Sequence, residues 1–167
     1  MPLATQLNKG HPPRVLLDNE LVVDALLSGS GLAARLRQAW LTHRCRPIGC
    51  QATLLDLMQR MRQPQLGLTS AEQQALLSEY LPYVLRVRLP ASIADESVRP
   101  ARLPWLQLAL ASRAHAIVTP DPVLLSARER LPFSVLELDP FVQLLRRPLQ
   151  EPRQERRRHL DAELCAA

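Results

Sequence analysis

The sequence predicts an α/β fold, a three-layer α/β/α sandwich around a mostly parallel sheet of about five strands. Short apolar runs alternate along the chain with longer segments in which apolar residues recur at helical spacing. Two of the apolar runs lead to an aspartate, Asp18 and Asp121, directly before a helical segment. Such alternation favours parallel strands, because each helix carries the chain back to the same end of the sheet.

The N-terminal third of the chain predicts two strands and two helices. Residues 14–18 form a short apolar run that predicts a buried strand. Residues 20–27 predict a short helix, which the Gly- and Ser-containing segment 28–31 closes. Residues 32–43 repeat apolar side chains at helical spacing and predict a second helix. Residues 46–49 predict the next short strand.

The middle of the chain predicts two helices and a third strand. Residues 51–62 predict a helix with a continuous apolar face. The members of that face are Leu54, Leu55, Met58 and Met61. After a break at residues 64–69, Ser70 is the expected N-cap of a helix that ends near Tyr80, because acidic and amide residues follow in its first turn. Residues 83–89 alternate apolar and polar side chains and predict the third strand.

The remaining helix and strand signals lie after a polar loop at residues 90–103. Residues 105–113 predict a helix, and Pro104 suits its first turn. Residues 116–119 predict the fourth strand. Asp121 as N-cap with a proline at the next position predicts a helix that ends near residue 130.

A fifth strand over residues 134–138 and a short helix over residues 140–146 complete the predicted domain. The chain of 167 residues is enough for one domain that buries roughly 70% of its unfolded surface. We expect a disordered lead-in over residues 1–13, the domain over residues 14–147, and a charged C-terminal tail over residues 148–167.

The apolar runs and the cysteines of the chain indicate the cellular compartment to expect. No apolar run approaches about 18 residues, and the lead-in lacks the apolar segment of a signal peptide. The three cysteines, Cys45, Cys50 and Cys165, show no CxxC spacing and predict reduced thiols. We therefore expect a cytoplasmic protein without a membrane partner.

The charge of the chain is carried by arginine. The net charge is +5 and Lys9 is the only lysine. Arginine binds phosphate bidentately, which favours nucleic acid as a partner, but a GC-rich genome produces the same composition without selection for binding. Aromatic residues make up only 4% of the chain, so a base-stacking platform is poorly supported. The tail either holds RNA through phosphate contacts or only improves solubility; its arginines and those just before it are Arg146, Arg147, Arg153, Arg156, Arg157 and Arg158.

Five segments occur in an order and spacing that match a known family. Residues 17–21 (Leu-Asp-Asn-Glu-Leu) resemble its Leu-Asp-Thr-Asn-Val opening, and residues 50–57 resemble its Ser-x-x-Leu-Leu-x-Glu-Leu helix. Residues 105–111 resemble its Phe-Leu-x-Leu-Ala-Leu helix, and residues 117–125 its Val-Thr-Gly-Asp-x-Asp-Leu-Leu segment. Residues 134–145 match its closing strand and helix. Over residues 14–146 the chain thus resembles PIN domains, in particular the toxin components of toxin–antitoxin systems.

The resemblance implies a PIN-like sandwich with strand order 3-2-1-4-5. Strands 1 and 4 are then neighbours at the topological switch point, where Asp18 and Asp121 converge. PIN nucleases gather three or four carboxylates around Mg²⁺ or Mn²⁺ ions. By resemblance, Asp18, Asp56 and Asp121 are the catalytic residues and metal ligands, and Glu20 is a further metal ligand.

The acids of this chain depart from the family pattern at several positions. Asp56 stands where the family has a glutamate, one methylene longer. The acid expected before the Trp105 helix falls on Arg102 or Leu103, and the second acid of the Asp-x-Asp pair falls on Val123. The side chains of Arg102, Leu103 and Val123 cannot ligate a cation. We expect weakened Mg²⁺ or Mn²⁺ binding, because such ions need concentrated oxygen charge.

Two functions are consistent with this sequence. The first is a metal-dependent endoribonuclease of the toxin type with reduced activity. The alternative is a catalytically degenerate PIN-like domain that binds RNA or a protein partner without cleavage. The loop acids Asp95 and Glu96 either replace the lost ligand or only form a polar loop. RNA, an antitoxin-like protein and a second copy of the chain are the candidate partners.

Overall fold

A computed structural model of the chain describes residues 11–89 and 103–146. At its centre is a sheet of five strands, all parallel, in the order β3-β2-β1-β4-β5. The predicted sandwich and strand order are therefore confirmed. The strands are β1 (Arg14–Leu17), β2 (Arg46–Gly49), β3 (Leu85–Arg86), β4 (Ala116–Val118) and β5 (Ser134–Leu136).

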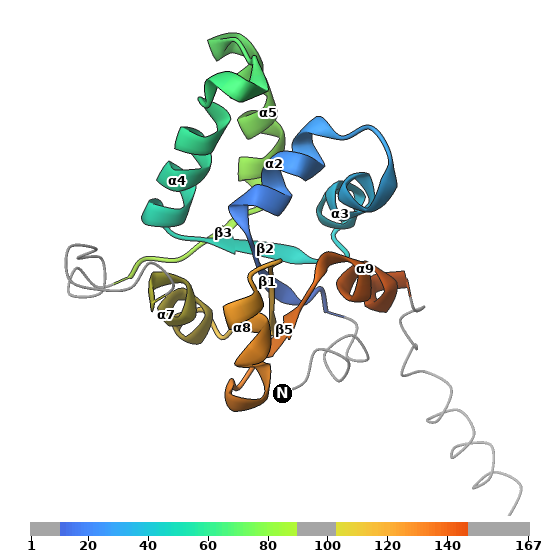
Figure 1. Cartoon of the computed structure of the whole chain (residues 1–167), viewed down its shortest axis with the longest axis vertical. Helices are drawn as coiled ribbons and strands as arrows, with labels where there is room; N and C mark the ends of the chain where they lie inside the picture. The colour runs from blue at the N-terminus through green and yellow to red at the C-terminus, as the bar shows by residue number, and fades with distance from the viewer. Residues whose placement is uncertain (1–10, 90–102, 147–167) are drawn as a thin grey trace, which may run out of the picture.

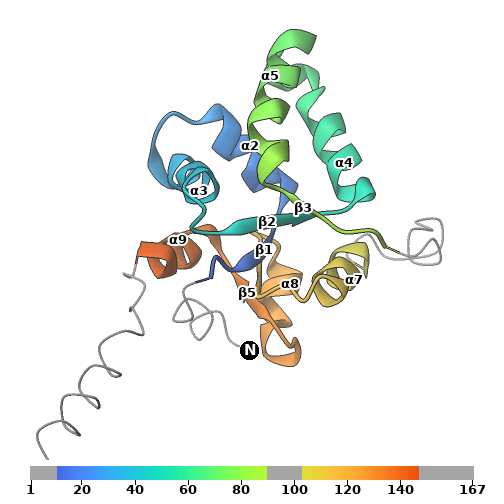
Figure 2. The ribbon, with the colours of Figure 1, turned by 180° about the vertical axis from the view of Figure 1, so that it is seen from behind.

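Helices cover both faces of the sheet (Figures 1 and 2). One face carries the helices that connect the first three strands, together with the last helix; the other face carries the two helices that flank β4. The first group is α2 (Asn19–Leu27), α3 (Gly31–Leu41), α4 (Gln51–Met61), α5 (Ser70–Tyr80) and α9 (Leu138–Arg146). The second is α7 (Leu103–Ala111) and α8 (Pro122–Ser126).

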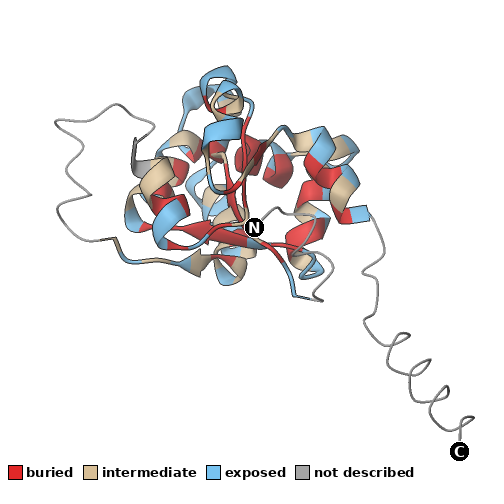
Figure 3. Cartoon of the chain, turned by 90° about the horizontal axis from the view of Figure 1, so that it is seen from below, coloured by how far each residue is buried: buried red, intermediate tan, exposed pale blue. Residues whose placement is uncertain are grey.

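The strands supply the centre of the core, because alternate side chains of a strand point to opposite faces. In β1, Val15 and Leu17 pack with the helices of one face, whereas Leu16 packs with those of the other. All three are fully or nearly fully buried. Figure 3 shows the buried sheet between helices that are buried in part and exposed in part. Strands buried on both faces are typical of parallel sheets, which explains their continuous apolar runs.

Register places two loops at the same edge of the sheet. Leu17 of β1 lies beside Val118 of β4. The backbone N–H of Asp18 extends this pairing by donating to the Val118 carbonyl at 2.9 Å. The residues that follow the two strands, Asp18 and Thr119, therefore leave the sheet side by side at its carboxyl edge.

The third strand is shorter than residues 83–89, the predicted span. Leu81–Tyr83 form a 3-10 turn around Pro82, and regular pairing with β2 covers only Leu85–Arg86. One more backbone bond follows, from Val87 to the Gly49 carbonyl. Within the described residues, β3 is an edge strand that pairs only with β2, and β2 ends at Gly49, so the regular pairing ends there.

Other boundaries differ by a few residues. The helix predicted to run from Asp121 to residue 130 ends at Ser126 and continues as a separate 3-10 turn, Arg128–Arg130. The N-cap before α5 is Thr69, not Ser70: its hydroxyl accepts from the Glu72 N–H, while the Glu72 carboxylate accepts from the Thr69 N–H. The polar loop from residue 90 to 102 and the tail from residue 147 lie outside the described residues. No helix within the described ranges is long and apolar enough to span a bilayer.

Candidate functional site

Asp18 holds two different donors with its two carboxylate oxygens. It leaves β1 in extended conformation and acts as the N-cap of α2, where Oδ1 accepts from the Glu20 N–H at 3.1 Å. Its Oδ2 accepts from the Thr119 hydroxyl at 2.8 Å. A helix cap needs only the first of these bonds. The second bond ties the carboxylate to the neighbouring strand and fixes its position at the edge of the sheet.

Thr119 links the two predicted acids of this edge. Its side chain is only 1% exposed. Its hydroxyl donates its single proton to Asp18 and accepts from the backbone N–H of Asp121 at 3.1 Å. A buried hydroxyl is costly unless it is hydrogen-bonded, and here both its donor and an acceptor position are used. Asp18 and the backbone of Asp121 therefore share one buried side chain.

Asp121 begins α8, as its sequence context predicts. Its Oδ1 accepts from the Val123 N–H at 2.9 Å, and Pro122 occupies the first helical position. This capping bond accounts for an aspartate here, so the structure supports a local role for the carboxylate. Val123, where the family pattern places a second acid, is 50% exposed.

Asp56 lies on α4 and reaches the start of α2. Its Oδ2 accepts from Asn19 Nδ2 at 2.7 Å and from Arg60 Nε at 2.9 Å. Asn19 is buried and donates its other amide proton to the Thr53 carbonyl at 2.8 Å. Because Asn19 directly follows Asp18, this bridge ties the third predicted acid to the segment that carries the first.

Glu20 is exposed in the first turn of α2, and its backbone, not its carboxylate, contacts Asp18. A carboxylate in this position also interacts favourably with the positive end of the helix dipole. The loop residues Asp95, Glu96 and Arg102 lie outside the described residues, as does the arginine-rich tail. Leu103 is the first residue of α7.

The acidic groups as placed form an incomplete ligand set for a divalent ion. Within residues 11–89 and 103–146, no three Asp, Glu, His or Cys side chains gather closely enough to hold a metal. Magnesium needs several oxygen ligands in near-octahedral arrangement. One oxygen of Asp56 is already bound by the Arg60 cation, a partner that repels metal ions.

Three site residues were missed by sequence reasoning. Asn19 and Thr119 are uncharged, and neither pattern nor charge marks a buried polar bridge between separate segments. Thr119 does stand within the Val-Thr-x-Asp motif, which offered a signal. Arg60 follows Asp56 by four residues, and this helical spacing of opposite charges is readable from sequence.

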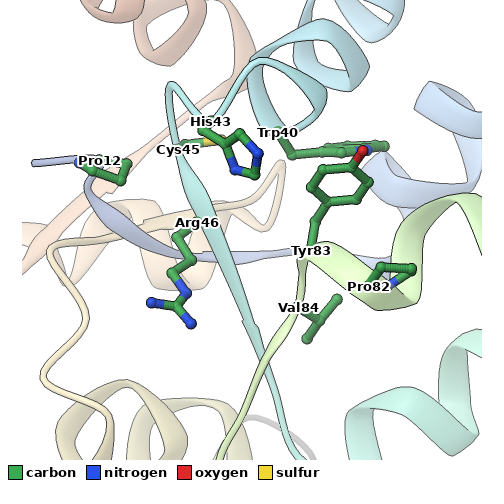
Figure 4. A pocket seen from close by; sticks show the side chains of 8 residues that line it. All are labelled: Pro12, Trp40, His43, Cys45, Arg46, Pro82, Tyr83 and Val84. Atoms are coloured by element: carbon green, nitrogen blue, oxygen red, sulfur yellow. The ribbon is translucent and has the colours of Figure 1, made fainter.

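The opposite, amino edge of the sheet has a different character. A hollow of about 210 Å³ lies there beside the first residue of β2, Arg46, and is lined by Trp40, His43 and Tyr83 among others (Figure 4). In Figure 4 the Arg46 side chain points away from the aromatic group. Burial raises the pKa of the neighbouring Cys45 thiol to about 12, which keeps it protonated and unreactive.

A second hollow at this edge, of about 480 Å³, lies beside Arg14 and His115. The Arg14 backbone N–H donates to His115 Nδ1 at 2.9 Å, and the Arg14 guanidinium donates to the Arg113 carbonyl at 3.0 Å. Neither hollow contains the acids predicted to form the site. The candidate site is therefore the carboxyl edge, where the predicted acids lie.

Comparison with solved structures finds proteins of similar fold. The chain is similar in structure to VapBC2 from Rickettsia felis, solved bound to a DNA fragment from their promoter: TM-score 0.50, 14% identity, 74% of this chain and 97% of that chain covered. PAE2754 from Pyrobaculum aerophilum matches with a TM-score of 0.49 and 14% identity over 86% of this chain and 95% of that chain. No curated protein sequence matches.

A family model described as PIN domain matches residues 14–122. This span contains β1 through β4 and the three aspartates of the candidate site. It ends at the first residue of α8, directly after Asp121. The match covers more than half of the chain, and the resemblance noted in the sequence is thereby confirmed. The chain belongs to the PIN domain family.

Proposed function

We propose that this chain is an endoribonuclease of the toxin type, with a weakened divalent-ion site and reduced activity. The observation that carries the proposal is the bond between the Asp18 carboxylate and the buried Thr119 hydroxyl. Capping of α2 does not require it, because the other oxygen of Asp18 already accepts from the helix N–H. The bond orients an acid at the switch point of a parallel sheet, where α/β proteins bind their ligands.

The residues of this edge suit the handling of a phosphodiester in the following way. A divalent ion, when bound, supplies positive charge that stabilises the transition state of phosphodiester hydrolysis. Thr119 holds Asp18 and the start of α8 in fixed relation. Asn19 holds Asp56 beside the same segment. The arginine excess of the chain favours RNA through its phosphates.

A cleavage assay tests this proposal. Purified wild type is compared with Asp18→Asn on structured and unstructured RNA, with Mg²⁺, with Mn²⁺ and with EDTA. We expect slow cleavage that EDTA or the substitution abolishes. Asp139→Asn is the matched control. Asp139 lies in the first turn of α9, and its side-chain hydrogen bond in the described structure is to Gln143 on the same helix. Cleavage that persists in EDTA and in Asp18→Asn would refute the proposal.

A second function is favoured by the contact between Asp56 and Arg60. With one candidate ligand already neutralised, the domain would bind RNA or a protein without cutting. Removal of residues 149–167 separates the two kinds of partner. Loss of RNA affinity, with a smaller salt dependence of roughly one logarithmic unit per lost phosphate contact, would indicate RNA held by the tail. Unchanged, salt-insensitive behaviour would indicate a protein partner.

An antitoxin-like protein lying over the acidic edge is the protein partner that we propose. The fold similarity to VapBC2 makes such a partner worth testing by co-purification. Association with a second copy of the chain stays a prediction, as does a cytoplasmic location.

A further inference from the structure

The Arg60 side chain is a cation that contacts a candidate ligand, Asp56. Its Nε donates to Asp56 Oδ2 at 2.9 Å, one turn along α4. The two side chains are 41% and 46% exposed, respectively. A half-exposed pair of this kind contributes little to stability. The contact is therefore better explained by what it does to the charge of the site.

The position of the pair is set by a buried group and not by the pair itself. Asn19 is 5% exposed, and its amide donates to the same Asp56 oxygen that Arg60 contacts. The same amide is fixed to the Thr53 carbonyl. Asp56 is thus held next to the segment that begins with Asp18, and it holds the Arg60 guanidinium there in turn.

The charge of Arg60 is also felt by acids other than Asp56. Its pKa is raised above the ordinary value, chiefly by the hydrogen bond to Asp56 and further by the negative charges of Asp56, Asp18 and Glu20. These are three of the four residues predicted as metal ligands. The guanidinium therefore interacts favourably with the carboxylates that a divalent ion would need.

We propose that Arg60 is a built-in counter-cation of the acidic site, which occupies the Asp56 carboxylate and competes with a divalent ion for it. The inference rests on the proposed function, since it concerns the same site. A metal ion must displace the guanidinium from Asp56 before it gains that ligand. Weak ion binding is then a property set by Arg60 as well as by the acids that the chain lacks.

Titration calorimetry with Mn²⁺ on the full chain tests this inference. Arg60→Gln should bind Mn²⁺ at least about tenfold more tightly than wild type, because it removes a positive charge next to the ion and frees Asp56. Arg60→Lys keeps the charge and should stay close to wild type. Arg62→Gln is the matched control: Arg62 lies at the end of the same helix, exposed, without an ion pair among the described residues, and should leave the affinity unchanged.

Equal Mn²⁺ affinities of Arg60→Gln and Arg62→Gln would overturn the inference, including the case in which neither binds. Arg60→Met, which keeps the alkyl stem, replaces the Gln variant if thermal unfolding shows that the latter is poorly folded. The outcome is independent of the cleavage assay. Tighter Mn²⁺ binding by Arg60→Gln supports the counter-cation even if no RNA is cut, and metal-dependent cleavage by wild type with an unaltered Arg60→Gln titration would remove only this inference.

Discussion

The two edges of the sheet hold their polar groups in different ways. At the carboxyl edge, side chains bond to one another as well as to backbone groups: Thr119 to Asp18, and Asn19 to Asp56. At the amino edge, Arg14 and His115 bond to backbone groups. Backbone partners satisfy strand ends and loops, whereas bonds between side chains position particular functional groups. The difference agrees with the proposal that the amino edge closes the fold and the carboxyl edge carries the chemistry.

The largest expected effect concerns the amino edge. Trp40 is fully buried, and its ring lies 5.0 Å from that of Tyr80 in an edge-on arrangement. We expect Trp40→Ala to destabilise the domain by about 3–5 kcal/mol, since the cavity it leaves cannot fully collapse. Urea denaturation measures this loss. Arg46→Gln, at an exposed residue beside the same hollow, should change stability by less than about 0.5 kcal/mol. Comparable losses for both would show that the stability of this edge does not depend chiefly on the buried Trp40 ring.

The next prediction compares the loss of the Thr119 hydroxyl at the carboxyl edge with the loss of the Thr42 hydroxyl. Thr119→Val removes the donor of Asp18 and the acceptor of the Asp121 N–H, and we expect a loss of about 1–2 kcal/mol in stability. Divalent-ion affinity should fall about tenfold, as for other supporting residues of metal sites. Thr42→Val is the control, because the Thr42 hydroxyl is exposed and bonds only within its own helix end. Thermal unfolding and Mn²⁺ titration report both quantities.

A smaller effect distinguishes the two roles of Asp121. Asparagine caps helices about as well as aspartate, so Asp121→Asn should retain stability within about 0.5 kcal/mol. If the carboxylate also serves the acidic site, Mn²⁺ affinity falls by about tenfold in the same variant. Calorimetry on folded Asp121→Asn is decisive. An unchanged Mn²⁺ affinity would show that the Asp121 carboxylate does not serve as a metal ligand.

The smallest effect is a pH dependence at the amino edge. Burial, together with the charge of Arg14, lowers the pKa of His115 below its ordinary value near 6.5. The unfolded chain then binds the proton more readily than the folded one, so stability falls as the pH drops through about 6.5. His115→Gln should reduce the change of the denaturation midpoint with pH between about pH 7 and 5. A profile as steep as that of wild type would assign the dependence to other groups.

The strand order was predictable because apolar runs, helix starts and family-like spacing all agreed. Asp18 and Asp121 were predictable for the same reason, since each ends an apolar run at a helix start. The short β3 was not, because its length depends on where β2 ends and on the turn around Pro82. The roles of Asn19 and Thr119 depend on contacts between segments 34 and 101 residues apart, and the motif that contains Thr119 does not reveal its partner.

The shared hydroxyl of Thr119 also gives the acidic edge a natural spectroscopic reporter. Its oxygen accepts from the Asp121 amide while its proton points to Asp18. Hydrogen bonds in such a chain polarise one another. A change of charge on the Asp18 carboxylate therefore alters the chemical shift of the Asp121 amide proton, two hydrogen bonds away. In isotope-labelled protein, the Asp121 amide resonance would thus follow events at Asp18 without any probe attached to the acid itself.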